Sequence, residues 1–239
     1  MIFNPQINIS LLLESNIHFG HKDYLCHSDM KKYIHNIKLN TSIIDLQKAL
    51  IKLCKALKIF YVASMNDFKI LFINTKMQTA DITKETAIRC GQYYVNHRWL
   101  GGMLTNWKTI SSSILKLKDY TRILNRKNSH YTKREISSII KRKNKLEKII
   151  YGMKDMKILP NILFVINVKT HCTVIREAKK LGIVIIGIID TNSSFNNIDF
   201  IIPGNDDSRK SISLYCNLIS ETIIKAKKQT MRSVIDYEK

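Results

Sequence analysis

The sequence predicts an α/β fold with three layers and an inserted helical hairpin, and two patterns along the chain lead to this expectation. Short apolar runs of strand length alternate with segments of helical periodicity on both sides of residues 104–153. Within 104–153 such runs are absent, and apolar residues recur at near-heptad spacing. Apolar strands that alternate with helices are typical of a parallel sheet covered on both faces. We therefore expect a Rossmann-like or flavodoxin-like three-layer parallel sheet.

The expected elements follow one another in the order that such a sheet requires. Leucines recur every three or four residues from Leu46 to Leu57, with lysines opposite, and predict an amphipathic helix. Helices are expected at residues 45–64, 79–91 (ended by Gly91), 176–182 and 208–228. Strands are expected at residues 69–74, 93–96, 162–167, 184–190 and 200–206.

Residues 104–153 carry the pattern of two antiparallel helices joined by a short polar loop. The near-heptad positions are Trp107, Ile110, Ile114, Leu117 and Leu124, then Ile136, Ile139, Leu146, Ile149 and Met153. Such seams predict a coiled-coil hairpin, inserted at 104–153 in a single α/β domain that spans residues 1–239. The faces away from the seam carry Arg126, Lys127, Lys133, Arg134, Lys141, Arg142, Lys143, Lys145 and Lys148.

The net charge indicates a polyanionic partner. The chain has 39 lysines and arginines against 19 aspartates and glutamates, which gives a formal charge of +20. An excess of this size over a whole chain is typical of proteins that bind nucleic acid. The alternative is a solvated surface enriched in lysine by an AT-rich genome, which the low counts of 8 glycines and 3 prolines would fit.

Three features bear on where the protein works. The longest apolar run, residues 181–189, is far shorter than the roughly 18 residues of a membrane span. Residues 1–16 show neither a basic signal-peptide start nor an Arg-rich transit pattern. The 5 cysteines form no Cys-x-x-Cys pair, so we expect reduced thiols. The protein is expected to act where it is made, without a membrane partner.

An enzyme of this fold class would place catalytic groups at the carboxyl ends of its strands. Asp190, Asp206 and Asp207 stand at such ends, yet no nucleotide-binding glycine motif, hydrolase elbow or zinc-protease motif is present. Asp207 or Ser208 is better placed as the N-cap of the last helix. No nucleophile and base can be named, so we expect no catalytic residue, no small-molecule substrate and no enzyme.

Four possible metal ligands lie close together near the amino end. His18, His21, Cys26 and His27 could each bind a metal, but their spacing matches no structural zinc pattern. We therefore expect neither a metal nor another cofactor. The simpler interpretation is a turn after a short helix, with Gly20 for its geometry and the histidines hydrogen-bonded or touching phosphate.

Aromatic and basic residues are interleaved ahead of the predicted hairpin, as they are where single-stranded nucleic acid stacks on protein. Arg98 is the better candidate for a contact, and Trp99 is left open between stacking on a base and packing. The residues expected to pack the sheet and the hairpin base are Tyr93, Tyr94 and Trp107. Just beyond, Gly101 and Gly102 mark a constrained turn or a surface that a partner approaches closely.

Several segments together carry a resemblance to a known family. LLESNIHFGHK, MKKYI, IIDLQKAL, NHRWLGGMLTNWKTI, LPNILFVI, EAKKLGI, IIDTN and IPGNDDSRKSI occur in this order between about residues 7 and 225. In these segments the chain resembles the small-subunit ribosomal protein two family of the bacterial type. The resemblance implies a non-catalytic constituent of the ribosome, in the cytoplasm of a bacterium or the interior of an organelle.

The resemblance also implies partners and a place on the ribosome. The family contacts small-subunit rRNA between the head and the body on the solvent side, next to other small-subunit proteins, and in many bacteria supports ribosomal protein one. The expected rRNA contacts are Lys22, Lys31, Lys32, Lys76, Arg98, Trp99, Gly101, Gly102, Asn106, Lys108, Lys141, Arg142, Lys143, Lys145, Arg209 and Lys210. A general nucleic-acid-binding regulator and a free α/β enzyme are the alternative functions.

Overall fold

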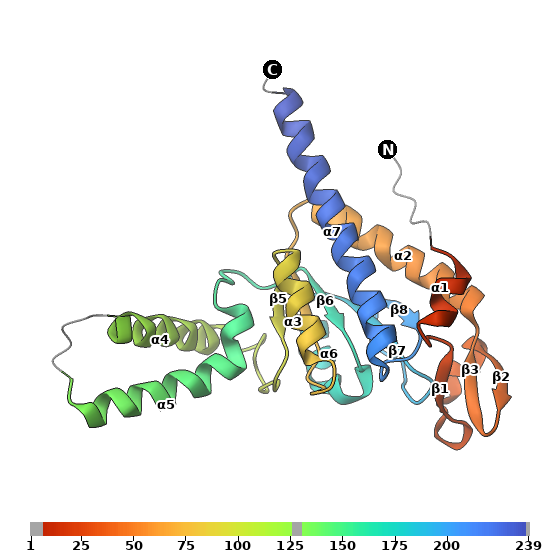
Figure 1. Ribbon diagram of the computed structural model, residues 1–239, viewed down its shortest axis with the longest axis horizontal. Helices are drawn as coiled ribbons and strands as arrows, with labels where there is room; N and C mark the ends of the chain where they lie inside the picture. The colour runs from red at the N-terminus through yellow and green to blue at the C-terminus, as the bar shows by residue number, and fades with distance from the viewer. Residues whose placement is uncertain (1–6, 126–130, 238–239) are drawn as a thin grey trace.

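The computed structural model describes residues 7–125 and 131–237, which build a five-stranded parallel sheet between two layers of helices (Figure 1). The strands lie in the order β5-β4-β6-β7-β8. They are β4 (Ile70–Ile73), β5 (Tyr93–Val95), β6 (Ile162–Val165), β7 (Val184–Ile189) and β8 (Phe200–Pro203). All five coincide with predicted strands, and the predicted fold class is confirmed.

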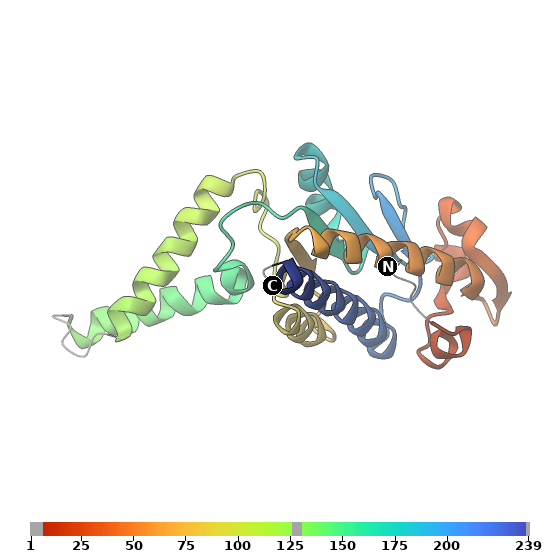
Figure 2. The same ribbon diagram turned by 90° about the horizontal axis from the view of Figure 1, so that it is seen from above.

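Different helices cover the two faces of the sheet, because successive side chains of a strand point to opposite faces. Ile70 and Phe72 lie in one core cluster, with α2 (Leu46–Met65), α3 (Ala80–Arg89) and α7 (Arg209–Tyr237). Leu71 and Ile73 lie in a second cluster, with α6 (Cys172–Lys180) and the base of the hairpin. Figure 2 shows α2 and α7 side by side.

Local signals begin and end these helices where the sequence predicts. The carboxylate of Asp45 caps α2 by accepting hydrogen bonds from the backbone N–H groups of Gln47 and Lys48, at 3.0 and 3.3 Å. Gly91 follows α3 with φ +61°, a conformation that glycine adopts without the clash of a Cβ atom. In the first core cluster, the ring of Phe164 packs edge-on against the rings of Phe60 and Phe72, with centroid distances of 5.7 and 5.5 Å.

The predicted helical hairpin lies between β5 and β6 and projects from one side of the sheet (Figures 1 and 2). It consists of α4 (Trp107–Asn125) and α5 (Lys133–Ile150). Thr132 and Glu135 form a capping box at the start of α5, in which each side chain accepts a backbone N–H of the other residue. The predicted loop cations Arg126 and Lys127 lie outside the described residues.

The heptad seam is buried only near the body of the protein. Ile110, Ile114, Leu117 and Met153 are buried and belong to the second core cluster, together with residues of the sheet. The remaining seam positions are half-buried: Trp107, Leu124, Ile136, Ile139, Leu146 and Ile149. The inner part of α4 is therefore packed into the sheet's own core, and only the outer part of the hairpin relies on contact between its two helices.

A small antiparallel sheet near the amino end was not predicted. Its strands β1 (Phe19–Lys22), β2 (Ile34–Lys38) and β3 (Thr41–Ile44) lie in the order β1-β3-β2, preceded by α1 (Ile9–Glu14). The expected turn after a short helix is present at residues 15–18, directly after α1, but Gly20 lies in β1 and not in that turn. Gly20 is required for close approach, since a Cβ would lie 2.7 Å from Oγ1 of Thr191. Figure 1 shows this sheet at the opposite end of the molecule from the hairpin.

The junction between α5 and the sheet depends on a glycine. The 3₁₀ turn η3 (Tyr151–Met153) follows α5 and lies against β5. A Cβ at Gly152 would overlap the carbonyl oxygen of Tyr94 and come within 2.7 Å of its ring. Only a residue without a side chain lets the end of the hairpin pack this closely on the edge strand.

We expect Gly152→Ala to lower the free energy of unfolding by roughly 1–3 kcal/mol, because the added methyl forces η3 away from β5. Gly101→Ala is the matched control, since a Cβ there would meet nothing within 4 Å. The control should stay within about 0.5 kcal/mol of the unmodified protein. Urea unfolding followed by circular dichroism measures both, and equal midpoints for the two variants would contradict the packing described here.

Candidate nucleic-acid interface

The loop that joins β5 to the hairpin is organised around one buried carboxylate. Glu177 lies on α6 and is only 7% exposed. Its Oε1 accepts hydrogen bonds from Nε1 of Trp99 at 3.1 Å and from the backbone N–H of Gly102 at 2.8 Å. Its Oε2 accepts from the backbone N–H groups of Leu104 and Thr105, at 3.0 and 3.3 Å. One side chain thus fixes the path of the chain from the sheet into α4.

The ionisation of Glu177 is coupled to these hydrogen bonds. Burial raises the pKa of the Glu177 carboxyl, but hydrogen bonds from Trp99, Leu104 and Gly102 outweigh burial, and the net pKa lies below its ordinary value of 4.5. The charged form is therefore the one that the loop binds. Its contribution to stability is present above pH 4.5 and is lost as the pH falls through the lowered pKa.

The two adjacent glycines have different roles in this loop. Gly102 has φ +87°, which an L-residue rarely adopts, and its N–H points at Glu177. Gly101 has no positive φ, and a Cβ on it would meet no atom within 4 Å. The predicted constrained turn therefore rests on Gly102, while Gly101 is open to the surface.

Trp99 is held by packing, which was one of the two alternatives left open by the sequence. It is half-buried against the second core cluster, and its indole N–H is taken by Glu177. Tyr94 is buried in the first core cluster. Tyr93 and Trp107 are half-buried against the second core cluster, so all three pack as expected. The exposed members of the predicted contact set in this loop and the start of α4 are Arg98, Gly101, Asn106 and Lys108.

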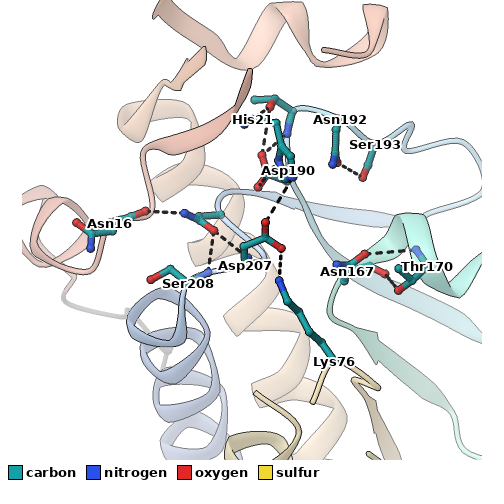
Figure 3. Close-up of polar contacts among 12 residues, drawn as sticks. Asn16, His21, Lys76, Asn167, Thr170, Asp190, Asn192, Ser193, Asp207 and Ser208 are labelled. Atoms are coloured by element: carbon teal, nitrogen blue, oxygen red, sulfur yellow. Dashed lines mark hydrogen bonds and ion pairs between the residues drawn. The ribbon is translucent and has the colours of Figure 1, made fainter. Parts of the chain in front are cut away.

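A second polar cluster lies at the carboxyl ends of the parallel strands (Figure 3). His21 stands between two carboxylates, with Nδ1 3.2 Å from Oδ2 of Asp190 and Nε2 3.4 Å from Oδ2 of Asp207. Nζ of Lys76 lies 2.5 Å from Oδ1 of Asp207. The backbone N–H of His21 also donates to Oγ1 of Thr191 at 2.8 Å, which ties β1 to the end of β7.

The charges of this cluster balance one another. Contact with Asp190 raises the pKa of His21, while burial lowers it by less. Burial, together with Asp190 and Asp207, raises the pKa of Asp206 well above its ordinary value. Burial raises the pKa of Asp207 as well, but Lys76 and His21 reverse this, and its pKa is lowered. Burial and the neighbouring carboxylates therefore favour the neutral form of Asp206, whereas Lys76 and His21 favour the charged form of Asp207.

Several cations of the predicted contact set form ion pairs or ring contacts with other residues of the protein. Lys76 pairs with Asp207 as described, and Arg209 forms a two-point ion pair with Asp81, at 3.1 and 2.7 Å. The ammonium of Lys32 lies 4.6 Å from the centroid of the Phe195 ring. Lys32 and Arg209 are nevertheless exposed, as are Lys22, Lys31 and Lys210.

Three of the four predicted contact cations on α5 are exposed and, within the described part of the chain, unpaired. Lys141, Arg142 and Lys145 are exposed, and none forms an ion pair with another residue that the structure describes. Lys143 differs, because it is half-buried and its Nζ lies 3.1 Å from Oε2 of Glu147. We use the name hairpin cations for the three exposed residues.

The predicted contacts therefore do not form a single site. The hairpin cations lie at one end of the molecule, whereas Lys22, Lys31 and Lys32 lie in or beside the small antiparallel sheet at the other end (Figures 1 and 2). Arg98 and Lys108 lie between these groups along the chain. The geometry fits a long surface contacted at several places and not one enclosed pocket.

The sequence did not predict the role of Glu177. A signal was present, because Val174, Glu177 and Ala178 stand at helical spacing and share the buried face of α6. An acid on an inward face needs donors, and the glycine-rich loop supplies them. The pairing of His21 with Asp190 had no such signal, because the two residues lie far apart in the sequence.

The described residues hold neither a metal-like cluster of side chains nor a membrane-spanning helix. No group of three or more histidine, cysteine, aspartate or glutamate side chains in residues 7–125 and 131–237 has the arrangement of a metal site. Across the same residues, none of the helices is both long and apolar enough to span a bilayer.

We expect Glu177→Gln to lower the free energy of unfolding at pH 7 by roughly 1–3 kcal/mol. The NH₂ group of glutamine replaces one of the two accepting oxygens, and it cannot accept the hydrogen bonds that the loop donates there. The difference from the unmodified protein should shrink below pH 4.5, where the wild-type carboxylate also loses its charge. Glu221→Gln, an exposed change on α7, is the control. Urea unfolding between pH 7 and 3 tests this, and a difference that does not depend on pH would refute it.

Comparison with known proteins agrees with these features. The family model described as Ribosomal protein S2 matches residues 12–226. The chain is 48% identical over 222 residues to the small ribosomal subunit protein uS2 of Wolbachia sp. subsp. Drosophila simulans (strain wRi), covering 92% of this chain and 79% of that protein. It is 44% identical over 226 residues to the uS2 protein of Ehrlichia canis (strain Jake), covering 95% and 78%. The chain belongs to the ribosomal protein S2 family.

Proposed function

We propose that this protein is a structural constituent of the small ribosomal subunit that binds small-subunit rRNA and supports assembly and translation. The observation that carries the proposal is the family match over residues 12–226. The net charge of +20 and the exposed hairpin cations support it, because rRNA is a polyanion. In this role residues 1–239 act as a single α/β domain with the hairpin at 104–153 as an inserted arm.

The proposal includes a place and partners. The protein lies between the head and the body on the solvent side of the subunit, beside other small-subunit proteins and, where it exists, ribosomal protein one. The relatives named above come from bacteria, which supports a ribosome in bacterial cytoplasm. The contacts proposed in addition to the hairpin cations are Lys22, Lys31, Lys32, Lys76, Arg98, Trp99, Gly101, Gly102, Asn106, Lys108, Lys143, Arg209 and Lys210.

The polar cluster at the carboxyl ends of the strands supports a non-catalytic role. A histidine that acts as a general base needs one ring nitrogen close to a nucleophile. Both ring nitrogens of His21 face carboxylates, those of Asp190 and Asp207. The cluster joins the amino-terminal sheet to the main sheet, and we assign it a structural role.

Sedimentation of cell lysate tests the proposed function directly. The protein should migrate with the small subunit at about one copy per subunit and remain there in high salt. Free protein at the top of the gradient would support an α/β enzyme instead. Substoichiometric association that is lost in moderate salt would support a general nucleic-acid-binding regulator, the second candidate, which the high positive charge alone would also fit.

We expect the triple variant Lys141→Gln, Arg142→Gln and Lys145→Gln to flatten the dependence of rRNA affinity on salt. Each cation that neutralises a phosphate contributes about 0.7–0.9 to the slope of log affinity against log salt, so the loss should be about two to three units. Filter binding of the purified protein to small-subunit rRNA at several salt concentrations gives the slope. Thermal stability should change little, because the three side chains are exposed.

A matched variant separates local contact from net charge. Lys55→Gln, Lys58→Gln and Lys225→Gln removes the same charge from exposed positions of α2 and α7. This control should keep the wild-type slope. Equal flattening by both variants would mean that the hairpin is not a specific contact, and an unchanged slope in the hairpin variant would remove it from the interface.

A further inference from the structure

The base of the hairpin has two hollows that share two wall residues, Glu147 and Tyr151. The first has a volume of about 450 Å³ and lies between α4 and the end of α5. The second has a volume of about 370 Å³ and lies between the end of α5 and β5 with the segment that follows it. Tyr151 is 38% exposed and lines both hollows.

The walls of both hollows are strongly basic. Among the described residues that line them, six cations stand against two carboxylates, those of Glu147 and Asp155. The cations are Lys118, Arg122, Lys143 and Lys154 in the first hollow and Lys84 and Lys148 in the second. Lys143 pairs with Glu147, and the guanidinium of Arg122 lies 3.6 Å from the exposed carboxylate of Asp119. A net positive charge at a concave surface attracts an anionic partner.

The position of Tyr151 is fixed from both neighbouring sides. Gly152 packs against the backbone of Tyr94, which leaves the adjacent Tyr151 at the surface. Nζ of Lys154 lies 4.2 Å from the ring centroid of Tyr151, and Lys154 lines the first hollow only. The second hollow is lined by Tyr151 but not by Lys154, and Asn96 and His97 are polar residues on its wall.

We infer that the second hollow holds one unpaired nucleotide of the small-subunit rRNA, with its base stacked on Tyr151. Lys84 and Lys148 would bind the phosphate of that nucleotide, and Asn96 and His97 would face the edge of the base. A flanking phosphate would bind in the first hollow, at Lys118 and Arg122. An aromatic ring with cations on both sides is how proteins hold unstacked bases. This inference rests on the proposed function but does not involve the hairpin cations.

An acidic protein segment is the competing occupant. It would satisfy the cations equally well, but it offers no planar face to an exposed aromatic ring. The base of a nucleotide matches both the ring and the charges, so RNA explains more of the observed surface.

Tyr151→Leu tests the inference, with binding of full-length small-subunit rRNA to the intact protein as the readout. Affinity should fall by about 5- to 150-fold, the range measured for loss of one stacked base. The salt slope should stay unchanged, because no charge is removed. Tyr151→Phe should keep wild-type affinity. Tyr131→Leu removes a tyrosine of the hairpin that is 44% exposed and lines neither hollow, and it should have no effect.

A second variant guards against misfolding of the first. Lys84→Gln with Lys148→Gln changes two exposed side chains, and it should flatten the salt slope by about 1.4 units for single-stranded RNA. Wild-type affinity in Tyr151→Leu, or equal losses in Tyr151→Leu and Tyr131→Leu, would overturn the inference. So would release of a neighbouring ribosomal protein from subunits without loss of rRNA affinity. The proposed function fails separately, if the wild-type protein itself does not bind rRNA.

Discussion

The buried carboxylate of Glu177 is the contact on which the layout of this protein depends. It accepts hydrogen bonds from the indole of Trp99 and from three backbone N–H groups of the loop ahead of α4. Without this acceptor the buried N–H of Leu104 and the partly buried N–H groups of Trp99 and Gly102 would lose their hydrogen-bond partner, which would destabilise the loop. A helix on one face of the sheet thereby sets the direction in which the hairpin leaves it, and hence where its cations are presented.

Charge is distributed in two ways over the molecule. At the carboxyl ends of the strands, His21 and Lys76 are matched by Asp190 and Asp207, so this edge is polar but balanced. On the hairpin, Lys141, Arg142 and Lys145 have no such partners among the described residues. Paired charges hold the fold together, and unpaired ones remain available to a partner. The number of lysines alone does not tell which charges stabilise the fold and which are available to a partner. Their exposure and their ion pairs do.

The sequence was sufficient for the main sheet and its helices, because strands buried on both faces leave continuous apolar runs. It was not sufficient for β1, β2 and β3, because these strands are short, partly exposed and contain polar residues, such as His21 and Lys22 in β1. The importance of the RWLGG segment was predicted, but its partner Glu177 was not. Contacts such as His21 with Asp190 join distant positions, and local pattern carries no information about them.

The attachment of the amino-terminal sheet also has a consequence for the order of folding. The hydroxyl of Ser211 donates to the carbonyl of Ser15, the N–H of Asn205 donates to the carbonyl of Ile17, and the N–H of His27 donates to the carbonyl of Thr191. The amino-terminal segment therefore finds these three contacts only after the chain has been synthesised beyond residues 191–211. Native pairing of this kind has a high contact order and forms late. Until then the amino-terminal strands can pair only with one another, and the contacts that hold their sheet against the main sheet are missing.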